Sequence, residues 1–320
     1  DYANAIGVYL AFSVDKISDT NSMCVSWNIT RDGLRNTFAR QALAMTWDFA
    51  EGNPLGNSSG CYSNALDWIQ RSLLYLPADK NGFAEQHDAQ TDNGLRSIMV
   101  STDPPYYDNI CYADLSDYFY VWLRGALKNM YPDLFRTMQV PKAEELIASP
   151  YRFDNGFQEA KLFFENGMLQ TFQQINTYAR DDVPVTVYYA FKQSEGDDSG
   201  NTSSTGWETM LSAIIQAGFS ITGTWPIRTE REVRTIASGS NALASSIVLV
   251  CRKRPANAPV CTRRDFINTL KRELKPALQK LQASNIAPVD LAQSAIGPGM
   301  GVYSRFSKVL EADGTPMSVR

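Results

Sequence analysis

Residues 97–107 read Ser-Ile-Met-Val-Ser-Thr-Asp-Pro-Pro-Tyr-Tyr and join a short apolar run to an acid, two prolines and two aromatic residues. The run Ile98, Met99 and Val100 is typical of a strand that is buried on both faces. Because proline has no N–H group and cannot continue a central strand ladder, we expect the strand to end at Asp103. Open α/β sheets bind ligands at the carboxyl ends of their strands, so this strand end is the first candidate for a functional site.

Strand and helix patterns alternate through the chain from Gly82 onward. We expect strands at 83–87, 98–103, 185–191, 219–225 and 246–251, and helices at 113–130, 157–178, 207–217 and 263–282. Alternation of this kind with buried apolar runs predicts an α/β fold whose sheet is mostly parallel. The last two strands are joined by a single loop, so they are expected to add an antiparallel final strand.

The segment before this alternation, residues 1–78, is expected to be helical. Apolar residues recur at helical spacing near its start, then with Phe38, Met45 and Phe49 on one face, and again from Leu66. The chain is therefore expected to begin with a helical region that precedes the α/β pattern.

Composition excludes several classes of protein. Of 320 residues, 44% are hydrophobic and 20% are charged, and no apolar run approaches the length of a membrane span, so no membrane partner is expected. The net charge of −4 gives no bulk attraction to nucleic acid, and any contact with DNA must come from local patches. Five scattered cysteines and one histidine, His87, predict no metal site and suit a reducing, cytoplasmic setting.

The Asp103-Pro-Pro-Tyr106 tetrapeptide resembles a motif of the amino-methyltransferases, which move a methyl group from S-adenosylmethionine (SAM) to an exocyclic base amine. The resemblance implies that the Asp103 carboxylate and the Pro104 carbonyl accept hydrogen bonds from the amine as positive charge develops on it. Pro105 would hold that carbonyl rigidly, and Tyr106 would stack on a base rotated out of the duplex. The structural alternative is a Pro-Pro turn that closes a strand, with surface tyrosines.

Further segments extend the resemblance over nearly the whole chain, at 101–110, 112–123, 140–146, 206–208, 224–230 and 241–252. Together they resemble a group of large bacterial and archaeal adenine-specific DNA methylases that carry an N-terminal domain of unknown function and often lie near anti-phage genes. The resemblance implies SAM-dependent N6-adenine methylation and a class I SAM-dependent methyltransferase (Rossmann-like) sheet. It divides the chain into a helical, target-recognition-side region (1–78), the catalytic half of the methyltransferase domain (79–256) and a helical C-terminal extension (257–320).

One element of that family is missing from the sequence. Such enzymes carry an Asp-Pro-Phe-x-Gly-x-Gly type loop after the first strand, where glycines let the backbone approach SAM closely. Asn53–Gly56 and Gly297–Gly299 are expected to be Gly/Pro turns, but neither follows a strand pattern, and we reject both as substitutes. The expectation is therefore a fragment of a longer protein that holds the catalytic half of the site and binds SAM weakly or not at all.

The resemblance also supplies candidate binding residues. SAM contacts are expected from Asp88 and Asp103, and base or DNA contacts from Tyr106, Tyr107, Asn109, Lys142 and Arg228. Each has a plain structural alternative: Asp88 and Asn109 as turn or helix caps, Lys142 and Arg228 as solvated charges. The densest basic regions, Arg252–Arg254 and Arg263–Arg264, are candidates for non-specific contact with the DNA backbone or for a solvated helix entry.

Two other functions stay open from the sequence. The tip accepts either base amine, so N4-cytosine methylation is possible, although aspartate rather than serine at position 103 favours adenine. A chain without a glycine loop also suits a non-catalytic nucleic-acid-binding or assembly subunit descended from a methylase. Partners expected from the resemblance are DNA and other anti-phage or restriction-modification proteins.

Overall fold

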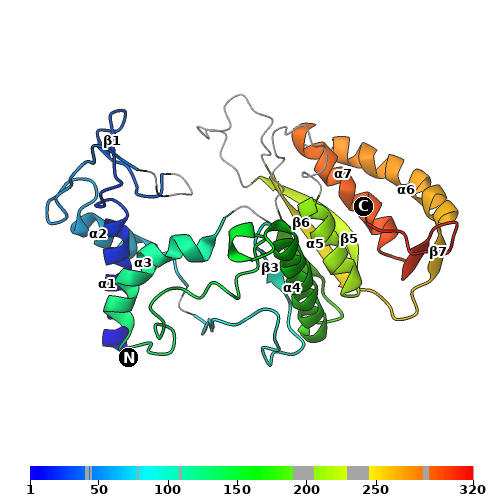
Figure 1. Cartoon of the computed structure of the whole chain (residues 1–320), viewed down its shortest axis with the longest axis horizontal. Coiled ribbons are helices and arrows are strands. Elements are labelled where there is room, and N and C mark those ends of the chain that lie inside the picture. The colour runs from blue at the N-terminus through cyan, green and yellow to red at the C-terminus, as the bar shows by residue number, and fades with distance from the viewer. Residues whose placement is uncertain are drawn as a thin grey trace. The chain divides into compact units, whose positions relative to one another are not determined.

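The computed structural model describes residues 1–39, 43, 45–77, 79–107, 110–189, 205–228, 245–283 and 288–319. The chain divides into two compact units (Figure 1). The helical unit comprises Asp1–Gln86 and Ile110–Glu145, and the sheet unit comprises His87–Asn109 and Leu146–Arg320. In this division, the residues predicted as a C-terminal extension, 257–320, belong to the sheet unit. Residues 110–145, predicted as part of the methyltransferase domain, belong to the helical unit.

The helical unit contains α1 (Tyr2–Ser18), α2 (Tyr62–Leu73) and α3 (Tyr112–Leu127), with α1 packed against both of the others. A two-stranded antiparallel hairpin, β1 (Trp27–Asn28) and β2 (Gly33–Leu34), follows α1. The helix expected around Phe38, Met45 and Phe49 is wrong, because the described residues of this stretch are loop and turn. Met45 is 76% exposed, so this apolar spacing does not mark a buried helix face.

The main sheet of the other unit has the order β3-β4-β6-β5. Its strands are β3 (Ser101–Thr102), β4 (Val185–Tyr189), β5 (Phe219–Arg228) and β6 (Ser245–Lys253). β3 runs parallel to β4, whereas β6 runs antiparallel to both β4 and β5. The structure is therefore mixed α/β, as predicted. The antiparallel pairing expected for the last two predicted strands is confirmed by β5 and β6.

The prediction of a mostly parallel sheet is wrong for the described residues, because only one of the three strand pairs is parallel. The strand expected at 83–87 does not form: these residues are exposed loop, and Phe83 is 87% exposed. With no strand beyond it in the described sheet, β3 is an edge strand. Met99 is accordingly 73% exposed while Val100 is buried, which corrects the expectation of burial on both faces.

Two helices cover the sheet and fill its core. α4 (Phe157–Tyr178) and α5 (Thr205–Gln216) pack against each other and lie side by side in Figure 1. The core between them and the strands contains fully buried side chains from each layer, among them Phe164, Phe172, Val187, Ile214 and Leu249. The bounds predicted for the 157–178 helix are confirmed, and Gly218, with φ +90°, ends the segment after α5 as its sequence position predicted.

The C-terminal part of the sheet unit is a helical pair with its own small core. α6 (Arg263–Ala283) packs on α7 (Pro288–Tyr303), and a short parallel pair joins β7 (Val260–Thr262) to β8 (Lys308–Leu310). The 310-helix η1 (Pro150–Arg152) precedes α4. Gly297–Gly299, read from sequence as a turn, lies inside α7 instead, where the helix packs closely on β5.

Candidate functional site at the carboxyl ends of β3 and β4

Parallel pairing brings the Asp-Pro-Pro-Tyr segment to a defined edge of the sheet. Ser101 pairs with Thr186 and Thr102 with Val187, so the chain leaves β3 at the edge where β4 ends with Tyr189. Before the strand, the Ile98 N–H donates to the carbonyl of Tyr178 (3.0 Å), at the end of α4. The tip, defined here as residues 103–107, is thus carried by backbone hydrogen bonds to two neighbouring segments.

Asp103 is the first residue of the tip and is exposed. No residue in the described ranges donates a hydrogen bond to its carboxylate, and partial desolvation raises the pKa of this carboxyl above its usual value. The next residue, Pro104, is buried, which fixes the backbone directly after the acid. The arrangement leaves a carboxylate with its acceptor capacity unused at the end of a strand.

The two tyrosines of the tip have different surroundings. Tyr107 is 7% exposed, and its ring packs edge-on against Phe164 with 5.1 Å between centroids. Its carbonyl accepts a hydrogen bond from the Ala148 N–H at 2.7 Å, so this residue anchors the tip in the core. Tyr106 is half-buried and meets Tyr189 edge-to-face at 5.5 Å. Of the two stacking candidates, Tyr106 is the more exposed.

A third aromatic residue completes this group. Trp207 packs against Tyr189 with 5.3 Å between ring centroids and a 76° interplanar angle. Gly206, beside it in the first turn of α5, lies so close to the tip that an added Cβ would be 3.4 Å from both the Tyr107 Cβ and the Tyr189 hydroxyl. Sequence reasoning noted the Gly-Trp pair only as part of a resemblance and missed Tyr189, although the last residue of a strand parallel to β3 has to lie at the tip's edge.

Asp88 belongs to a local turn and ends no strand. Its Oδ1 accepts hydrogen bonds from the backbone N–H (2.9 Å) and the side-chain amide (3.3 Å) of Gln90, and its carbonyl accepts from Thr91. Thr91 in turn lies 3.0 Å from Nε2 of His87. Asp88 thus caps a turn, as the structural alternative to a SAM contact predicted. A role of Asp88 in binding SAM stays a prediction.

The DNA-contact candidates fall in different places. The backbone of Arg228 ends β5 and pairs with Ser245, which places it at the tip's edge of the sheet, roughly 14 Å across three strand spacings from β3. Lys142 belongs to the helical unit, where its ammonium binds the Asp117 carboxylate at 2.7 Å. Asn109 lies outside the described residues. Their contacts with DNA stay predictions.

The basic run Arg252–Arg254 lies at the opposite edge from the tip. β6 is antiparallel to β4, so its start is near Tyr189 and its end is about 27 Å farther along the strand. All three side chains also have local partners: Arg252 donates to the carbonyl of Asp182, Lys253 binds Asp181, and Arg254 donates to the carbonyl of Ile215. This run is therefore remote from a base held at the tip.

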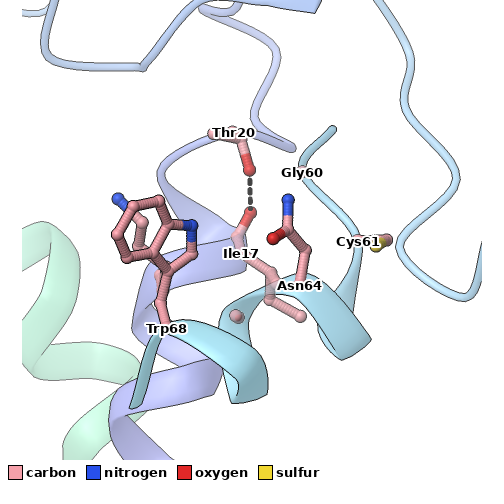
Figure 2. Close-up of a pocket in the computed structure, with 8 residues that line it drawn as sticks. Ile17, Thr20, Gly60, Cys61, Asn64 and Trp68 are labelled. Carbon is pink, nitrogen blue, oxygen red and sulfur yellow. Dashed lines mark hydrogen bonds between the residues drawn. The ribbon is translucent and has the colours of Figure 1, made fainter. Parts of the chain in front are cut away.

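Two pockets lie away from the tip residues. A pocket of about 60 Å³ in the helical unit is lined by Ile17, Thr20, Gly60, Cys61, Asn64 and Trp68 with two neighbours (Figure 2). The Cys61 thiol lies 3.2 Å from Ser63 Oγ, and this hydrogen bond is the main reason why its pKa is lowered. The volume is far below the roughly 300–1,000 Å³ of ligand sites. A larger, apolar pocket of about 320 Å³ lies between α6, α7 and residues 317–319.

The described side chains contain no cluster of three or more histidine, cysteine or acidic residues that could hold a metal ion. In the same ranges, no helix combines the length and apolarity needed to span a bilayer. Comparison of the chain with protein-family models, with curated proteins and with solved structures gives no match.

Proposed function

We propose that this chain carries the amine-binding half of an amino-methyltransferase site and acts on the N6 amine of adenine extruded from DNA. The observation that carries the proposal is the Asp103 carboxylate, exposed and without a donor among the described residues, at the carboxyl end of a strand that runs parallel to its neighbour. Open α/β sheets place ligand-binding groups at such ends.

The chemistry requires acceptors at this position. An exocyclic amine is a weak nucleophile because its lone pair is conjugated with the ring, and it gains positive charge as it attacks a methyl group. Asp103 and the carbonyl of Pro104 would accept hydrogen bonds from the two N–H groups and so stabilise that charge more in the transition state than before it. A buried Pro104 keeps the two acceptors in a fixed relation.

Tyr106 supports the proposal because its half-buried ring follows directly on these acceptors. A planar ring beside the acceptors would hold an extruded base by stacking, which typically contributes about 1–3 kcal/mol per base. The anchoring of Tyr107 by Phe164 and Ala148 keeps the backbone of the tip in place while Tyr106 makes that contact.

SAM would supply the methyl group. The residues present fit only part of a site for it: Asp103 is free to contribute, whereas the Asp88 Oδ1 accepts two hydrogen bonds from Gln90 and no glycine-rich turn follows a described strand. The mixed order of the sheet, one parallel pair followed by antiparallel pairs, is compatible with the carboxyl-terminal half of a larger methyltransferase sheet. The missing glycine turn equally favours the second candidate, a non-catalytic DNA-binding subunit descended from a methylase.

The proposal is tested by incubating the chain with millimolar labelled SAM and unmethylated DNA, followed by mass spectrometry of the nucleosides. N6-methyladenine is the expected product. Asp103→Ala should lower its yield by about a hundred- to a thousandfold, as does loss of one positioned electrostatic group elsewhere. N4-methylcytosine would shift the assignment to the other amine. Absence of both products at millimolar SAM, with DNA binding retained, would replace the enzyme proposal with the binding subunit.

A further inference from the structure

Three aromatic rings stand in series at the tip's edge of the sheet. Tyr106 meets Tyr189 with 5.5 Å between centroids and an 88° angle, and Tyr189 meets Trp207 at 5.3 Å and 76°. Both contacts are edge-to-face, the geometry that the ring quadrupole favours. The three residues come from the tip, from β4 and from α5, so the series links three separate segments of the chain.

Burial changes sharply along the series. Tyr189 is 2% exposed and Trp207 is 5% exposed, whereas Tyr106 is half-buried. The two inner rings are therefore held by the core, whereas the outer ring contacts Tyr189 and stays partly exposed. Tyr189 ends β4 in the alternating burial pattern of that strand, and Trp207 lies in the first turn of α5, so both inner rings are fixed by regular structure.

A half-buried tyrosine without such a partner would sample several side-chain rotamers, and a ligand that stacks on it would have to select one of them. Contact with Tyr189 removes part of that freedom before any ligand binds, which is how preorganisation raises affinity. The indole N–H of Trp207 is buried and has no acceptor among the described residues, and the contact with Tyr189 is made by the ring.

We infer that Tyr189 and Trp207 are positioning residues that hold the Tyr106 ring in the orientation in which it receives an extruded base. The inference rests on the proposed function for the identity of the ligand, but the positioning itself is a property of the three rings. An edge-to-face pair typically changes an equilibrium by about 2- to 10-fold beyond the effect of burial. Replacement of Tyr189 should therefore weaken base binding by that factor through Tyr106.

The first measurement reports on the ring itself and needs no methylation. With 3-fluorotyrosine placed at position 106, the ¹⁹F resonance of the full chain should be displaced from that of the free amino acid by the ring current of Tyr189. Tyr189→Leu should move it toward the free value, and Trp207→Leu should move it partly. Tyr189→Phe keeps the ring and should leave the shift close to that of the unmodified chain.

Phe172→Leu is the matched control. It removes a fully buried ring of the same core, carried by α4 and by none of the three segments of the aromatic series, and should lower stability without moving the Tyr106 resonance. A Tyr106 resonance that keeps its position in both Tyr189→Leu and Trp207→Leu overturns the inference, as does an equal response to the control.

The second measurement uses a single-stranded oligonucleotide with one 2-aminopurine as the probe. Tyr189→Leu should weaken its binding by about 2- to 10-fold, and Tyr189→Phe should restore it. In the Tyr106→Ala background, Tyr189→Leu should have no further effect, because a positioning residue acts only through the ring that it holds. Equal effects of Tyr189→Leu in both backgrounds contradict positioning. If the resonance and the binding measurements both give the expected results but the unmodified chain does not methylate DNA, the proposed reaction is overturned and the positioning stands.

Discussion

At the scale of single residues, burial raises the carboxyl pKa of two aspartates in the described part of the chain, Asp103 and Asp15. Asp103 is exposed at a strand end, where a raised pKa accompanies a candidate role. Asp15 lies within α1, half-buried, and its Oδ1 has no hydrogen-bond partner in the described part of the chain. An acid with a shifted pKa indicates a functional site only when the residues around it form one. The described residues show no such site at Asp15.

Asp15 therefore predicts a dependence of stability on pH. Burial raises its pKa to about 6 from 3.8, so between these values the folded chain binds more protons than the unfolded chain. The free energy of unfolding contributed by this group is then largest below pH 3.8 and is lost as pH rises through 6. Asp15→Asn should raise the melting temperature near pH 7.5 and change it little near pH 3.5.

The matched control for this prediction is Asp67→Asn, which changes an exposed aspartate on α2. It should have little effect at either pH. Equal melting temperatures of Asp15→Asn and the unmodified chain at pH 7.5 would show that burial does not penalise the Asp15 charge.

Lys142 offers a test between a structural and a DNA-binding role. Its Nζ binds Asp117 Oδ2 at 2.7 Å, both side chains are 28% exposed, and Asp117 Oδ1 also accepts from the Val140 N–H at 2.8 Å. A pair of this exposure is expected to contribute about 1 kcal/mol or less to stability. Lys142→Ala and Asp117→Ala should each destabilise the chain, and a double-mutant cycle by denaturant titration should show coupling between them.

DNA affinity separates the two roles of Lys142. Contact with a phosphate predicts that Lys142→Ala weakens DNA binding and makes it less dependent on salt concentration. Asp117→Ala, which removes the carboxylate partner of the same ammonium, should then bind DNA at least as well as the unmodified chain. No change in the salt dependence for Lys142→Ala would leave only the structural role.

At the scale of helices and strands, two glycines in helices have opposite surroundings. An added Cβ at Gly206, in α5, would make ordinary 3.4 Å contacts with Tyr107 and Tyr189. A Cβ at Gly297, in α7, would overlap the Thr224 side chain and lie 2.7 Å from the Thr224 Cβ. Thr224 belongs to β5, so the second glycine is what lets α7 pack closely on the sheet.

The changes in stability caused by Gly206→Ala and Gly297→Ala should therefore have opposite signs. Gly206→Ala is expected to leave stability unchanged or to increase it by up to about 1 kcal/mol, because alanine is the better helix former. Gly297→Ala gains the same propensity but is expected to lose about 1–3 kcal/mol, because Thr224 cannot relieve a clash at its Cβ by rotating. Chemical denaturation of both variants measures the difference, and a Gly297→Ala variant as stable as Gly206→Ala would contradict the close packing of α7 on β5.

The sequence predicts well those helices and strands whose type follows from the spacing of their own apolar residues. The 157–178 helix and the β4 and β6 strands carry apolar residues at spacings that match one structure only, and all three form. The stretches around Phe38 and at 83–87 carry similar short patterns, but the described residues there are loop. Residues 83–87 are exposed, and Phe38 packs on Tyr118 and Phe119 of α3 from a loop. Gly297–Gly299 reads as a turn because the neighbouring strand that requires its glycine is distant in sequence.

At the scale of the whole molecule, strand pairing is the feature that the sequence left least determined. The position of the proposed acceptors, Asp103 and Pro104, follows from a strand pattern and a proline, both local signals. The pairing of β3 with β4, which brings Tyr189 and then Trp207 to the same edge, joins residues 85 positions apart along the chain. No local pattern encodes that neighbour, so the aromatic series could be identified only from the structure.

The same sheet predicts how the chain handles SAM. In open α/β sheets, a nucleotide cofactor binds over a glycine-rich turn after a strand, where the missing Cβ allows the backbone to approach it. The described sheet has no strand beyond β3, and Asp88 is held in a turn by Gln90. Among the described residues of the proposed site, the tip with its Asp103 carboxylate then remains for SAM, so the affinity for SAM should be weaker than micromolar in titration calorimetry with the 320-residue chain.

Two variants make this last prediction specific. Asp103→Asn should remove what little binding remains, because it takes away the one free carboxylate of the tip. Asp88→Ala should leave SAM affinity unchanged and lower stability, because the Gln90 N–H then loses its acceptor. Micromolar binding by the unmodified chain that Asp88→Ala abolishes would reverse this assignment: Asp88 would then bind the cofactor, and the turn around Gln90 would be part of its site.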